Sequence, residues 1–355
     1  MKRVIVFGGY GVFGSQIARA LVEKGIETTV AGRDADQADR FARSLGGIAR
    51  GIAADLNKSD SCLRALKGHA VAVHAAGPFG GFDDTLLKAC VTVGCHYVDI
   101  ADDRRYAGIV RSAGAAFSDA GLAAVYGCSS LPGISGALGI AAKEGATSPV
   151  RRARSTLFIG NRNPKGIAAI RSLLGGLGQS IAAPQGMLRG FRDREVVPLP
   201  PPFGRRGVFN FDSPDYDLFS HLLGAKEVVV KVGFEMRSAT YAFAALSYLG
   251  AVSQTWMARL IEFPSRALGW TGCSGGAVMT ELFLENGEKR SASIGGPNNG
   301  QRMAALPAVF VAEALAHQPI VRSGACTAYE CLGAKALLDR LQQAGYELRI
   351  GEESP

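Results

Sequence analysis

A cluster of glycines near the start of the chain is suited to binding a phosphate group. Residues 4–14 read Val-Ile-Val-Phe-Gly-Gly-Tyr-Gly-Val-Phe-Gly, an apolar run that leads into glycines and then into a helical pattern. Glycines at such a turn let backbone N–H groups approach a pyrophosphate, and the N-terminus of the following helix adds a partial positive charge. A tight turn in some other α/β protein is the alternative interpretation. The residues predicted to contact the phosphates are Gly8, Gly9, Tyr10, Gly11, Val12, Phe13 and Gly14.

The residues after the second predicted strand indicate which dinucleotide would bind. This strand, Glu27–Ala31, is followed by Gly32-Arg33-Asp34. In a dinucleotide-binding fold this strand end faces the adenosine ribose, where an acid binds a 2′-hydroxyl and an arginine accommodates a 2′-phosphate. Arg33 therefore predicts NADP as the cofactor, whereas Asp34 is placed to cap the predicted helix 35–45. A solvated surface charge is the other interpretation of Arg33.

Two further strand ends are predicted to contact the cofactor. Asp55 follows the third predicted strand (48–54), where it would either contact the adenine or belong to the start of the predicted helix 60–67. Small and turn-forming residues follow the fourth predicted strand (70–74), and they allow the backbone to approach the cofactor closely. These residues are Ala76, Gly77, Pro78 and Phe79.

Acidic residues around the end of the fifth predicted strand (96–100) are candidates for proton transfer. Asp99, Asp102 and Asp103 could bind an amine or act as acid and base there. Capping of the predicted helix 104–120 would explain Asp102 or Asp103, but it does not explain Asp99. Cys128 follows the sixth predicted strand (122–126). The predicted catalytic residues are Asp99, Asp102 and Cys128.

Alternating strands and helices must position these residues. Six predicted strands alternate with helical patterns over residues 1–126, which is typical of right-handed crossovers and a parallel sheet. After Leu131-Pro132-Gly133 the pattern becomes a mixture of strands and helices, with a proline-rich loop at 198–202. We predict an α/β protein: a Rossmann doubly wound parallel sheet with an inserted second α+β domain and a C-terminal return. Residues 1–130 would bind NADP, residues 131–319 would bind the substrate and dimerise, and residues 320–355 would pack back on the first domain.

Composition and charge narrow the possible partners. The chain has 355 residues, of which 47% are hydrophobic and 20% charged, as in ordinary globular enzymes. Most of the net charge of +8 lies after residue 130, where it could attract anionic substrates or anionic lipid. The pattern of a nucleic-acid-binding module is missing. Seven scattered cysteines and five histidines predict neither a disulfide framework nor a metal site. Without a signal-peptide pattern, we expect a cytoplasmic protein.

The stretch 238–258 contains no charged residue and is long enough to cross a bilayer. Its six serine, threonine and glutamine residues make it polar for a spanning helix, so we predict a buried or amphipathic helix. Such a helix is also compatible with lining a pocket for an apolar substrate or resting on a membrane surface.

Together these motifs resemble the NADP-binding domain of the saccharopine dehydrogenase/reductase-like oxidoreductases. The resemblance rests on residues 8–14, 31–34, 75–79, 96–103 and 130–133. It implies a Rossmann domain with a C-terminal return, an inserted substrate domain and, in many members, a homodimer. It also implies hydride transfer from NADPH to a C=N or C=C bond of a small molecule in the interdomain cleft.

Two departures from related enzymes keep another function open. Leu131 stands where the lysine-pathway reductases of the family have an aspartate. The Tyr-x-x-x-Lys pair of many other Rossmann oxidoreductases is also missing from the sequence. A redox-sensing regulatory protein that binds NADP without turnover is therefore the alternative.

Overall fold

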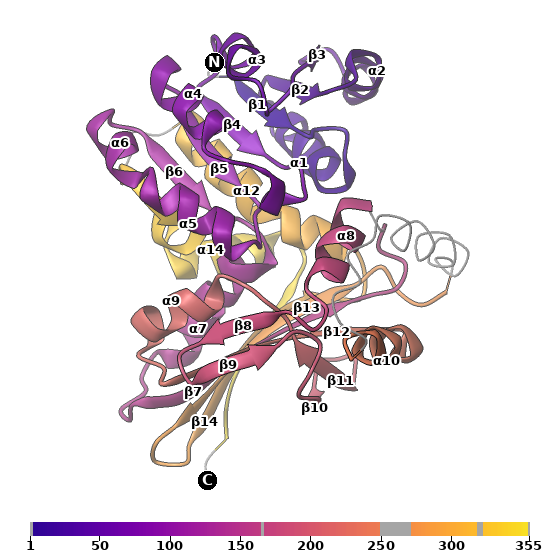
Figure 1. The fold of residues 1–355 in the computed structure, drawn as a ribbon, viewed down its shortest axis with the longest axis vertical. Helices are drawn as coiled ribbons and strands as arrows, with labels where there is room; N and C mark the ends of the chain where they lie inside the picture. The colour runs from indigo at the N-terminus through magenta and orange to yellow at the C-terminus, as the bar shows by residue number, and fades with distance from the viewer. Residues whose placement is uncertain (1–2, 165–166, 249–270, 318–321, 354–355) are drawn as a thin grey trace. The chain divides into compact units, whose positions relative to one another are not determined.

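The chain folds into two compact units, each made of two separate segments (Figure 1). The computed structural model describes residues 3–164, 167–248, 271–317 and 322–353. The first unit consists of Met1–Ser129 and Ala304–Gly333, and the second consists of Ser130–Met303 and Ala334–Pro355. The longer segment of the second unit is thus inserted into the first, and its shorter segment follows the first unit in the chain.

The first unit is built on a seven-stranded sheet of order β15-β6-β5-β4-β1-β2-β3. All neighbouring strands in it run parallel. This order confirms the predicted Rossmann doubly wound sheet, with the strand order reversing between β1 and β4. The strands are β1 (Val4–Phe7), β2 (Thr28–Gly32), β3 (Ala49–Ala53), β4 (Val71–His74), β5 (His96–Asp99), β6 (Ala123–Tyr126) and β15 (Gly324–Thr327).

Helices flank this sheet (Figure 1), and one predicted helix is divided in two. The pattern over 104–120 forms α5 and α6 with a break at Ala113. At the start of α6, a Cβ on Gly114 would lie 3.0 Å from the Cβ of Ala325, so a glycine there lets β15 approach closely. The helices are α1 (Val12–Glu23), α2 (Ala35–Leu45), α3 (Ser59–Leu66), the short turn η1 (Phe79–Gly81), α4 (Thr85–Val93), α5 (Arg104–Ser112), α6 (Gly114–Asp119), α12 (Gly300–His317) and α13 (Ala328–Leu332).

The returning segment begins and ends earlier than the sequence predicts: Ala304–Gly333 returns to the first unit, in place of 320–355. β15 extends the first sheet beside β6. By contrast, β16 (Glu347–Glu353) pairs antiparallel with β14 of the second sheet, and α14 (Ala334–Gln343) packs against α7. The prediction that all of 320–355 packs on the first domain is therefore wrong beyond residue 333. A strand pattern identifies β16 but cannot specify which of two open sheet edges it will pair with.

The second unit is built on a seven-stranded mixed sheet of order β10-β11-β12-β7-β13-β14-β16. The neighbours β7 and β12 are parallel, and the other pairs are antiparallel. A separate hairpin joins β8 (Ser180–Ala183) and β9 (Gly186–Arg189). The remaining strands are β7 (Val150–Ile159), β10 (Glu195–Pro198), β11 (Arg205–Asn210), β12 (Glu227–Phe234), β13 (Gly276–Leu284) and β14 (Lys289–Gly296).

The two faces of this sheet differ in chemistry. On one face α7 (Ser135–Lys143) packs on β13 and β14, and α9 (Asp215–Leu223) packs on β12. The other helices of the unit are α8 (Ile167–Gly175) and α10 (Arg237–Leu246), and a turn, η2, spans Ser130–Ile134. On the opposite face Arg154 pairs with Glu281 at 2.6 Å and with Glu195, and Lys231 pairs with Glu195 at 3.2 Å. Removing one partner would leave a buried charge unpaired. The ion-pair network therefore favours a single register of the strands.

The charge-free stretch 238–258 is described only in part. Residues up to Leu246 form α10, which agrees with a helix at this position. Residues 249–258 lie outside the described residues. Within the described ranges, no helix has both the length and the apolar character needed to span a bilayer.

Candidate functional site

The glycine turn after β1 is held by three glycines that the protein itself requires. Gly8 has a φ of +73°, and a Cβ there would lie 2.8 Å from the Cα of Ala76. A Cβ on Gly9 would lie 2.7 Å from the Val6 carbonyl oxygen, and one on Gly14 would lie 2.1 Å from the Gly8 carbonyl oxygen. Because these contacts involve backbone atoms, the three positions do not accept a larger residue without a shift of the turn.

Gly11 is different, because neither its conformation nor its surroundings in the protein demand a glycine. Its φ of −73° and ψ of 176° suit any residue. Among the described atoms outside its chain neighbours, a Cβ on Gly11 would come within 4 Å of the Gly8 carbonyl oxygen alone, at 3.0 Å. Gly11 is also the N-cap of α1, whose first turn receives no side-chain cap. The open side of Gly11 and the uncapped N–H groups fit an anion such as a pyrophosphate.

Tyr10 connects the glycine turn to the end of β2. A Cβ on Gly32 would lie 2.2 Å from Cε1 of Tyr10, so the tyrosine ring lies directly over this glycine. The backbone N–H of Asp34 donates to the Tyr10 hydroxyl at 3.2 Å. The sequence argument missed this role of Gly32, although a glycine that ends an apolar strand is a visible signal of close packing.

Arg33 and Asp34 differ in their surroundings. The Asp34 carboxylate caps α2, accepting from the Gln37 backbone N–H at 3.0 Å and from the Gln37 side chain at 2.6 Å. These hydrogen bonds hold the pKa of Asp34 below its usual value. Capping by Asp34 is therefore confirmed. Arg33 is exposed and forms no ion pair with any other described residue, so its guanidinium is available to a phosphate.

The segment after β4 lies against the glycine turn. The Ala75 N–H donates to the Phe7 carbonyl oxygen at 2.9 Å, and Ala76 is the residue that a larger side chain at position 8 would strike. Gly77 and Pro78 are exposed and remain predicted cofactor contacts. The Phe79 ring is 8% exposed and packs 4.8 Å from the His74 ring, so this side chain belongs to the core.

Asp55 makes local contacts at the carboxyl end of β3. One carboxylate oxygen accepts from the Asn57 N–H at 3.1 Å, and the other lies 3.5 Å from Nζ of Lys58. Its backbone N–H donates to the hydroxyl oxygen of Ser61, in the first turn of α3, at 2.9 Å. These contacts order the start of α3, and the adenine contact stays a prediction.

Asp99 is buried at the end of β5, and its carboxylate is hydrogen-bonded to the turn after β6. Its side chain is 0% exposed, and Oδ1 accepts from the N–H groups of Ala101 at 2.9 Å and Gly127 at 2.8 Å. Burial raises the pKa of Asp99 to about 7. A carboxyl group without exposed surface does not meet a substrate, so the structure reassigns Asp99 from proton transfer to holding the turn after β6.

The other residues considered for acid–base chemistry differ in how far they are exposed. Cys128 is 0% exposed, and burial holds its pKa well above the usual range, so the thiol is not a nucleophile here. Asp103 caps α5 by accepting from the Tyr106 N–H at 2.8 Å, as the capping interpretation predicts. Asp102 is half-buried at the carboxyl end of β5. Of the three predicted catalytic residues, only Asp102 therefore keeps exposed surface.

The comparisons with known proteins agree with this geometry. Residues 4–125 match the family model described as the saccharopine dehydrogenase NADP binding domain. The match covers about a third of the chain, from β1 into β6. The cofactor of this NADP-binding domain is a nicotinamide dinucleotide. No curated protein sequence matches the chain.

Two solved structures resemble the chain over its whole length. One is the apo form of saccharopine dehydrogenase (L-Glu forming) from Saccharomyces cerevisiae, with a TM-score of 0.68, 13% identity and 100% of both chains covered. The other is homospermidine synthase from Legionella pneumophila in complex with NAD, with a TM-score of 0.61, 14% identity, and 100% of this chain and 91% of that chain covered. At these identities the likeness shows a shared fold.

A buried network of aromatic side chains joins β4, β5 and α5 in the first unit. Nδ1 of His74 lies 3.1 Å from the hydroxyls of Tyr97 and Tyr106, which are 2.9 Å from each other. Burial lowers the pKa of His74 to about 3, so the imidazole is neutral. This network is not predictable from the sequence, because His74, Tyr97 and Tyr106 come together only in three dimensions.

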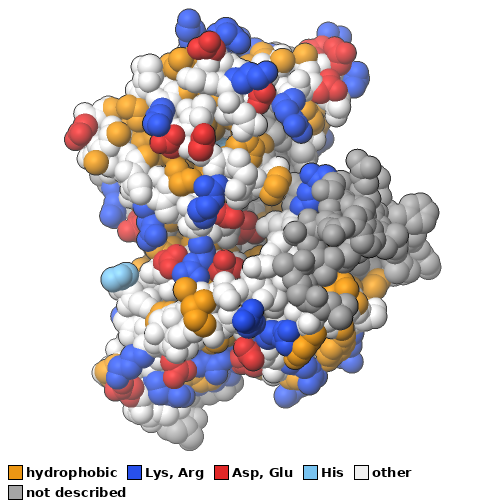
Figure 2. All heavy atoms as spheres, in the orientation of Figure 1, with side chains coloured by type: hydrophobic (Ala, Val, Ile, Leu, Met, Phe, Trp, Pro, Cys, Tyr) orange, Lys and Arg blue, Asp and Glu red, His pale blue; other side chains and the backbone are white. Residues whose placement is uncertain are grey.

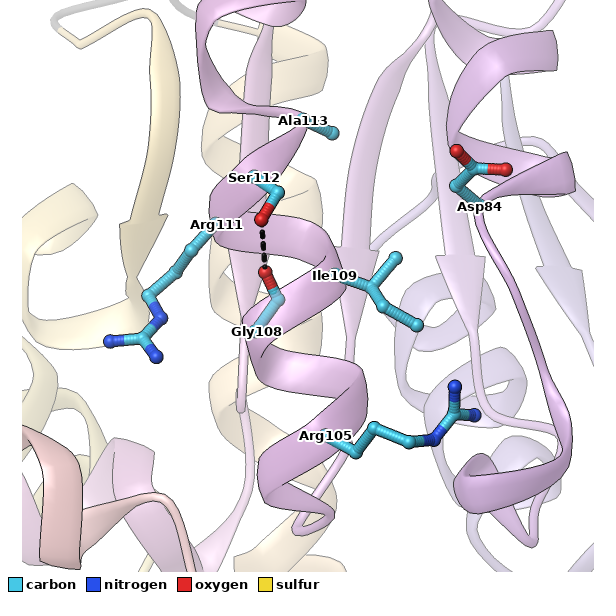
Figure 3. Close-up of a pocket in the computed structure, with 7 residues that line it drawn as sticks. All are labelled: Asp84, Arg105, Gly108, Ile109, Arg111, Ser112 and Ala113. Atoms are coloured by element: carbon cyan, nitrogen blue, oxygen red, sulfur yellow. Dashed lines mark hydrogen bonds between the residues drawn. The ribbon is translucent and has the colours of Figure 1, made fainter.

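The cavity drawn in Figure 3 is lined by residues between 84 and 113, and by none from the glycine turn at 8–14. It has a volume of about 790 Å³ and lies along α5 near the start of α4, and no predicted cofactor-binding residue lines it. Arg105 there donates to the carbonyl oxygens of Gly80 and Phe82 at 2.7 and 2.6 Å, which fixes the turn after β4. Among the described residues, no group of three His, Cys, Asp or Glu side chains could hold a metal ion.

Proposed function

We propose that the protein is an NADP(H)-dependent oxidoreductase that acts on a C=N or C=C bond of a small molecule. The supporting observation is the open side of Gly11 at the uncapped start of α1, together with the exposed Arg33, which forms no ion pair with the described residues. Bound NADPH would supply a hydride to the substrate carbon. The chain would hold the pyrophosphate at Gly11 and the 2′-phosphate at Arg33.

Reduction of such a bond also requires a proton for the second atom. Asp102 is the proposed donor or partner of a substrate ammonium group, because it is half-buried after β5 while Asp99 and Cys128 are fully buried. A substrate site in the interdomain cleft, a homodimer and a cytoplasmic location also remain predictions.

The burial of Asp99 and Cys128 favours a second candidate function. A protein that binds NADP and signals the redox state of the cell does not need a proton donor. A steady-state screen of NADPH oxidation over cyclic and linear imines and enoyl substrates separates the two functions. Turnover that falls strongly in Asp102→Asn supports the oxidoreductase, whereas tight NADPH binding without turnover supports the regulatory protein.

Arg33 should determine the preference between the two cofactors. We expect NADPH to bind at least tenfold more tightly than NADH, and Arg33→Ala to remove most of that preference, since tenfold is about 1.4 kcal/mol. Titration calorimetry with both cofactors measures it.

Two variants control for general effects of charge and of helix stability. Arg43→Ala removes an exposed arginine of α2, which pairs with Asp39 at 2.6 Å, and should leave the preference unchanged. Asp34→Ala should destabilise the protein by about 1 kcal/mol through the lost cap and also keep the preference. Equal affinity of the unmodified protein for NADPH and NADH would refute the assignment of Arg33.

A further inference from the structure

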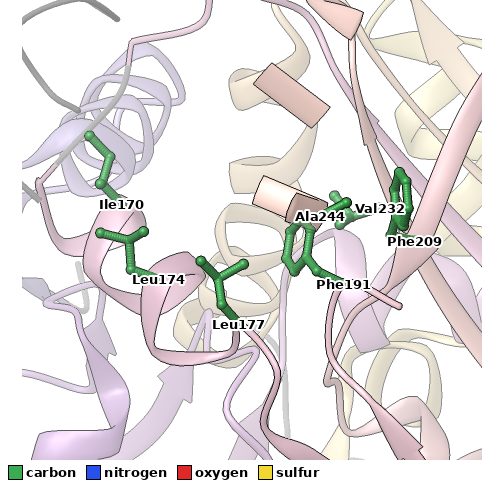
Figure 4. Packing of buried hydrophobic residues seen from close by; sticks show 7 residues of the cluster. All are labelled: Ile170, Leu174, Leu177, Phe191, Phe209, Val232 and Ala244. Carbon is green, nitrogen blue, oxygen red and sulfur yellow. The ribbon is translucent and has the colours of Figure 1, made fainter. Parts of the chain in front are cut away.

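The outward side of α10 carries almost no charge. Its inward side includes Thr240, Ala244 and Ser247, all less than 9% exposed. Ala244 packs into the apolar cluster of Phe191, Phe209 and Val232 shown in Figure 4. The exposed positions on and just after α10 are Arg237, Ser238, Tyr241, Ala242, Ala245 and Tyr248. Exposed faces of helices usually carry several charged residues, whereas this face has one, at its start.

The edge of the neighbouring strand pair extends this uncharged face. Val196 of β10 is 41% exposed and lies opposite Gly207 of β11. A Cβ on Gly207 would lie 3.1 Å from the Tyr241 hydroxyl, so Val196 and Tyr241 lie on the same side of the β10–β11 pair. Tyr241 is 42% exposed and Tyr248 is 70% exposed. We call Val196, Tyr241, Ala245 and Tyr248 the α10 patch.

Arginines border the α10 patch and contact its two tyrosines. The guanidinium carbon of Arg194 lies 5.5 Å from the centre of the Tyr241 ring, and that of Arg192 lies 3.1 Å from the centre of the Tyr248 ring. Arg205 is exposed at the start of β11. Figure 2 shows Lys and Arg side chains beside hydrophobic ones on this part of the surface. The patch therefore combines exposed aromatic rings with a positive rim.

The acids close to this rim in sequence are already engaged. Glu195 points to the opposite face of β10, where it pairs with Arg152 at 2.7 Å and Lys231 at 3.2 Å. Asp193 accepts from the Asn210 side chain at 2.7 Å. Arg192, Arg194 and Arg205 outnumber the exposed Asp193, so the rim carries a net positive charge.

We propose that the α10 patch docks the protein on the surface of a membrane that contains anionic phospholipids. Tyrosine rings with a polar tip suit the boundary between headgroups and acyl chains. Arginine guanidinium groups bind lipid phosphates and carboxylates through charge-assisted hydrogen bonds. A second copy of the chain fits less well, because a two-fold contact through this patch would bring the same arginines together. The proposal does not depend on whether the protein turns over a substrate.

Co-sedimentation of the full-length protein with vesicles tests the proposal. The protein should sediment with vesicles in which about a third of the lipid is phosphatidylserine, and much less with pure phosphatidylcholine or at high salt. Tyr241→Ser with Tyr248→Ser should lower the partition coefficient at least about tenfold. Arg194→Gln and Arg205→Gln should each lower it about fivefold.

Matched variants elsewhere control for loss of exposed apolar surface or charge. Met187→Ser replaces a side chain that is 66% exposed on β9, and Arg64→Gln replaces an exposed arginine of α3. Both should bind vesicles like the unmodified protein. Thermal midpoints and NADPH affinity of all variants should be unchanged, which separates this test from the proposed function. If the tyrosine variant does not fold, the two arginine variants still decide the question.

Two results would overturn the proposal. The first is vesicle binding that does not depend on the α10 patch. It would appear as equal or negligible binding to neutral and anionic vesicles, or as unchanged binding by the tyrosine and arginine variants. The other is sedimentation velocity without lipid that shows a dimer for the unmodified protein and a monomer for the tyrosine variant. That second result would assign the α10 patch to self-association instead.

Discussion

Gly11→Val is expected to abolish NADPH binding while the chain stays folded. The backbone angles of Gly11 are open to valine, and a Cβ would meet the Gly8 carbonyl oxygen at 3.0 Å, so the cost in stability should be about 1 kcal/mol or less. The side chain would instead occupy the space in which a pyrophosphate approaches the start of α1. Titration calorimetry should show at least a hundredfold loss of NADPH affinity, which is about 2.7 kcal/mol.

Gly14→Val is the matched comparison, because it places the same side chain one helical turn away. Its Cβ would lie 2.1 Å from the Gly8 carbonyl oxygen, so the turn must shift and stability should fall by several kcal/mol. Thermal unfolding distinguishes the two variants before any ligand is added. A folded Gly11→Val protein that binds NADPH normally would place the phosphates elsewhere.

Ionisation of Asp99 should lower the stability of the unmodified protein as the pH rises from about 4 to about 7. The pKa of Asp99 is raised from 3.8 to about 7 in the folded state by burial. Between these values the unfolded chain has released the proton that the folded chain still holds, so rising pH favours unfolding. Above pH 7 the contribution is constant. Three pKa units correspond to a loss on the order of 4 kcal/mol.

Asp99→Asn isolates this effect, because an amide does not ionise and its oxygen can still accept from Ala101 and Gly127. Denaturant unfolding should show the variant more stable than the unmodified protein at pH 8, with a smaller difference at pH 5. Buried Asp215, whose pKa is raised to about 6, adds a slope of the same sign in both proteins and cancels in the comparison.

Asp99→Ala should behave differently from the asparagine variant. It leaves two buried backbone N–H groups without an acceptor, so at every pH it should be about 2–5 kcal/mol less stable than Asp99→Asn. Parallel pH–stability curves for the unmodified and Asp99→Asn proteins would contradict the raised pKa of Asp99.

The features that could be predicted from the sequence are those that depend on neighbours along the chain. The strands that alternate with helices, the glycine turn and the caps by Asp34 and Asp103 all arise from residues a few positions apart. The Rossmann sheet follows from these elements, because short connections and right-handed crossovers leave few possible strand orders.

The features that could not be predicted depend on contacts between distant segments. Asp99 was placed correctly at a strand end, yet its burial depends on the turn at Gly127, in which φ is +62°. The His74 network needs Tyr97 from β5 and Tyr106 from α5 to meet one ring of β4. The pairing of β16 depends on which sheet has a free edge beside it. The residues of β16 themselves do not indicate which edge that is.

The inserted unit also sets an order of events during protein synthesis. The ribosome completes β6 at residue 126, but β15, which covers the edge of β6, begins only at residue 324. While the intervening segment is translated, the nascent first unit presents an open strand edge that can pair with other chains. The first unit begins to form early and is completed late, so the emerging chain depends most on chaperones through the middle of translation.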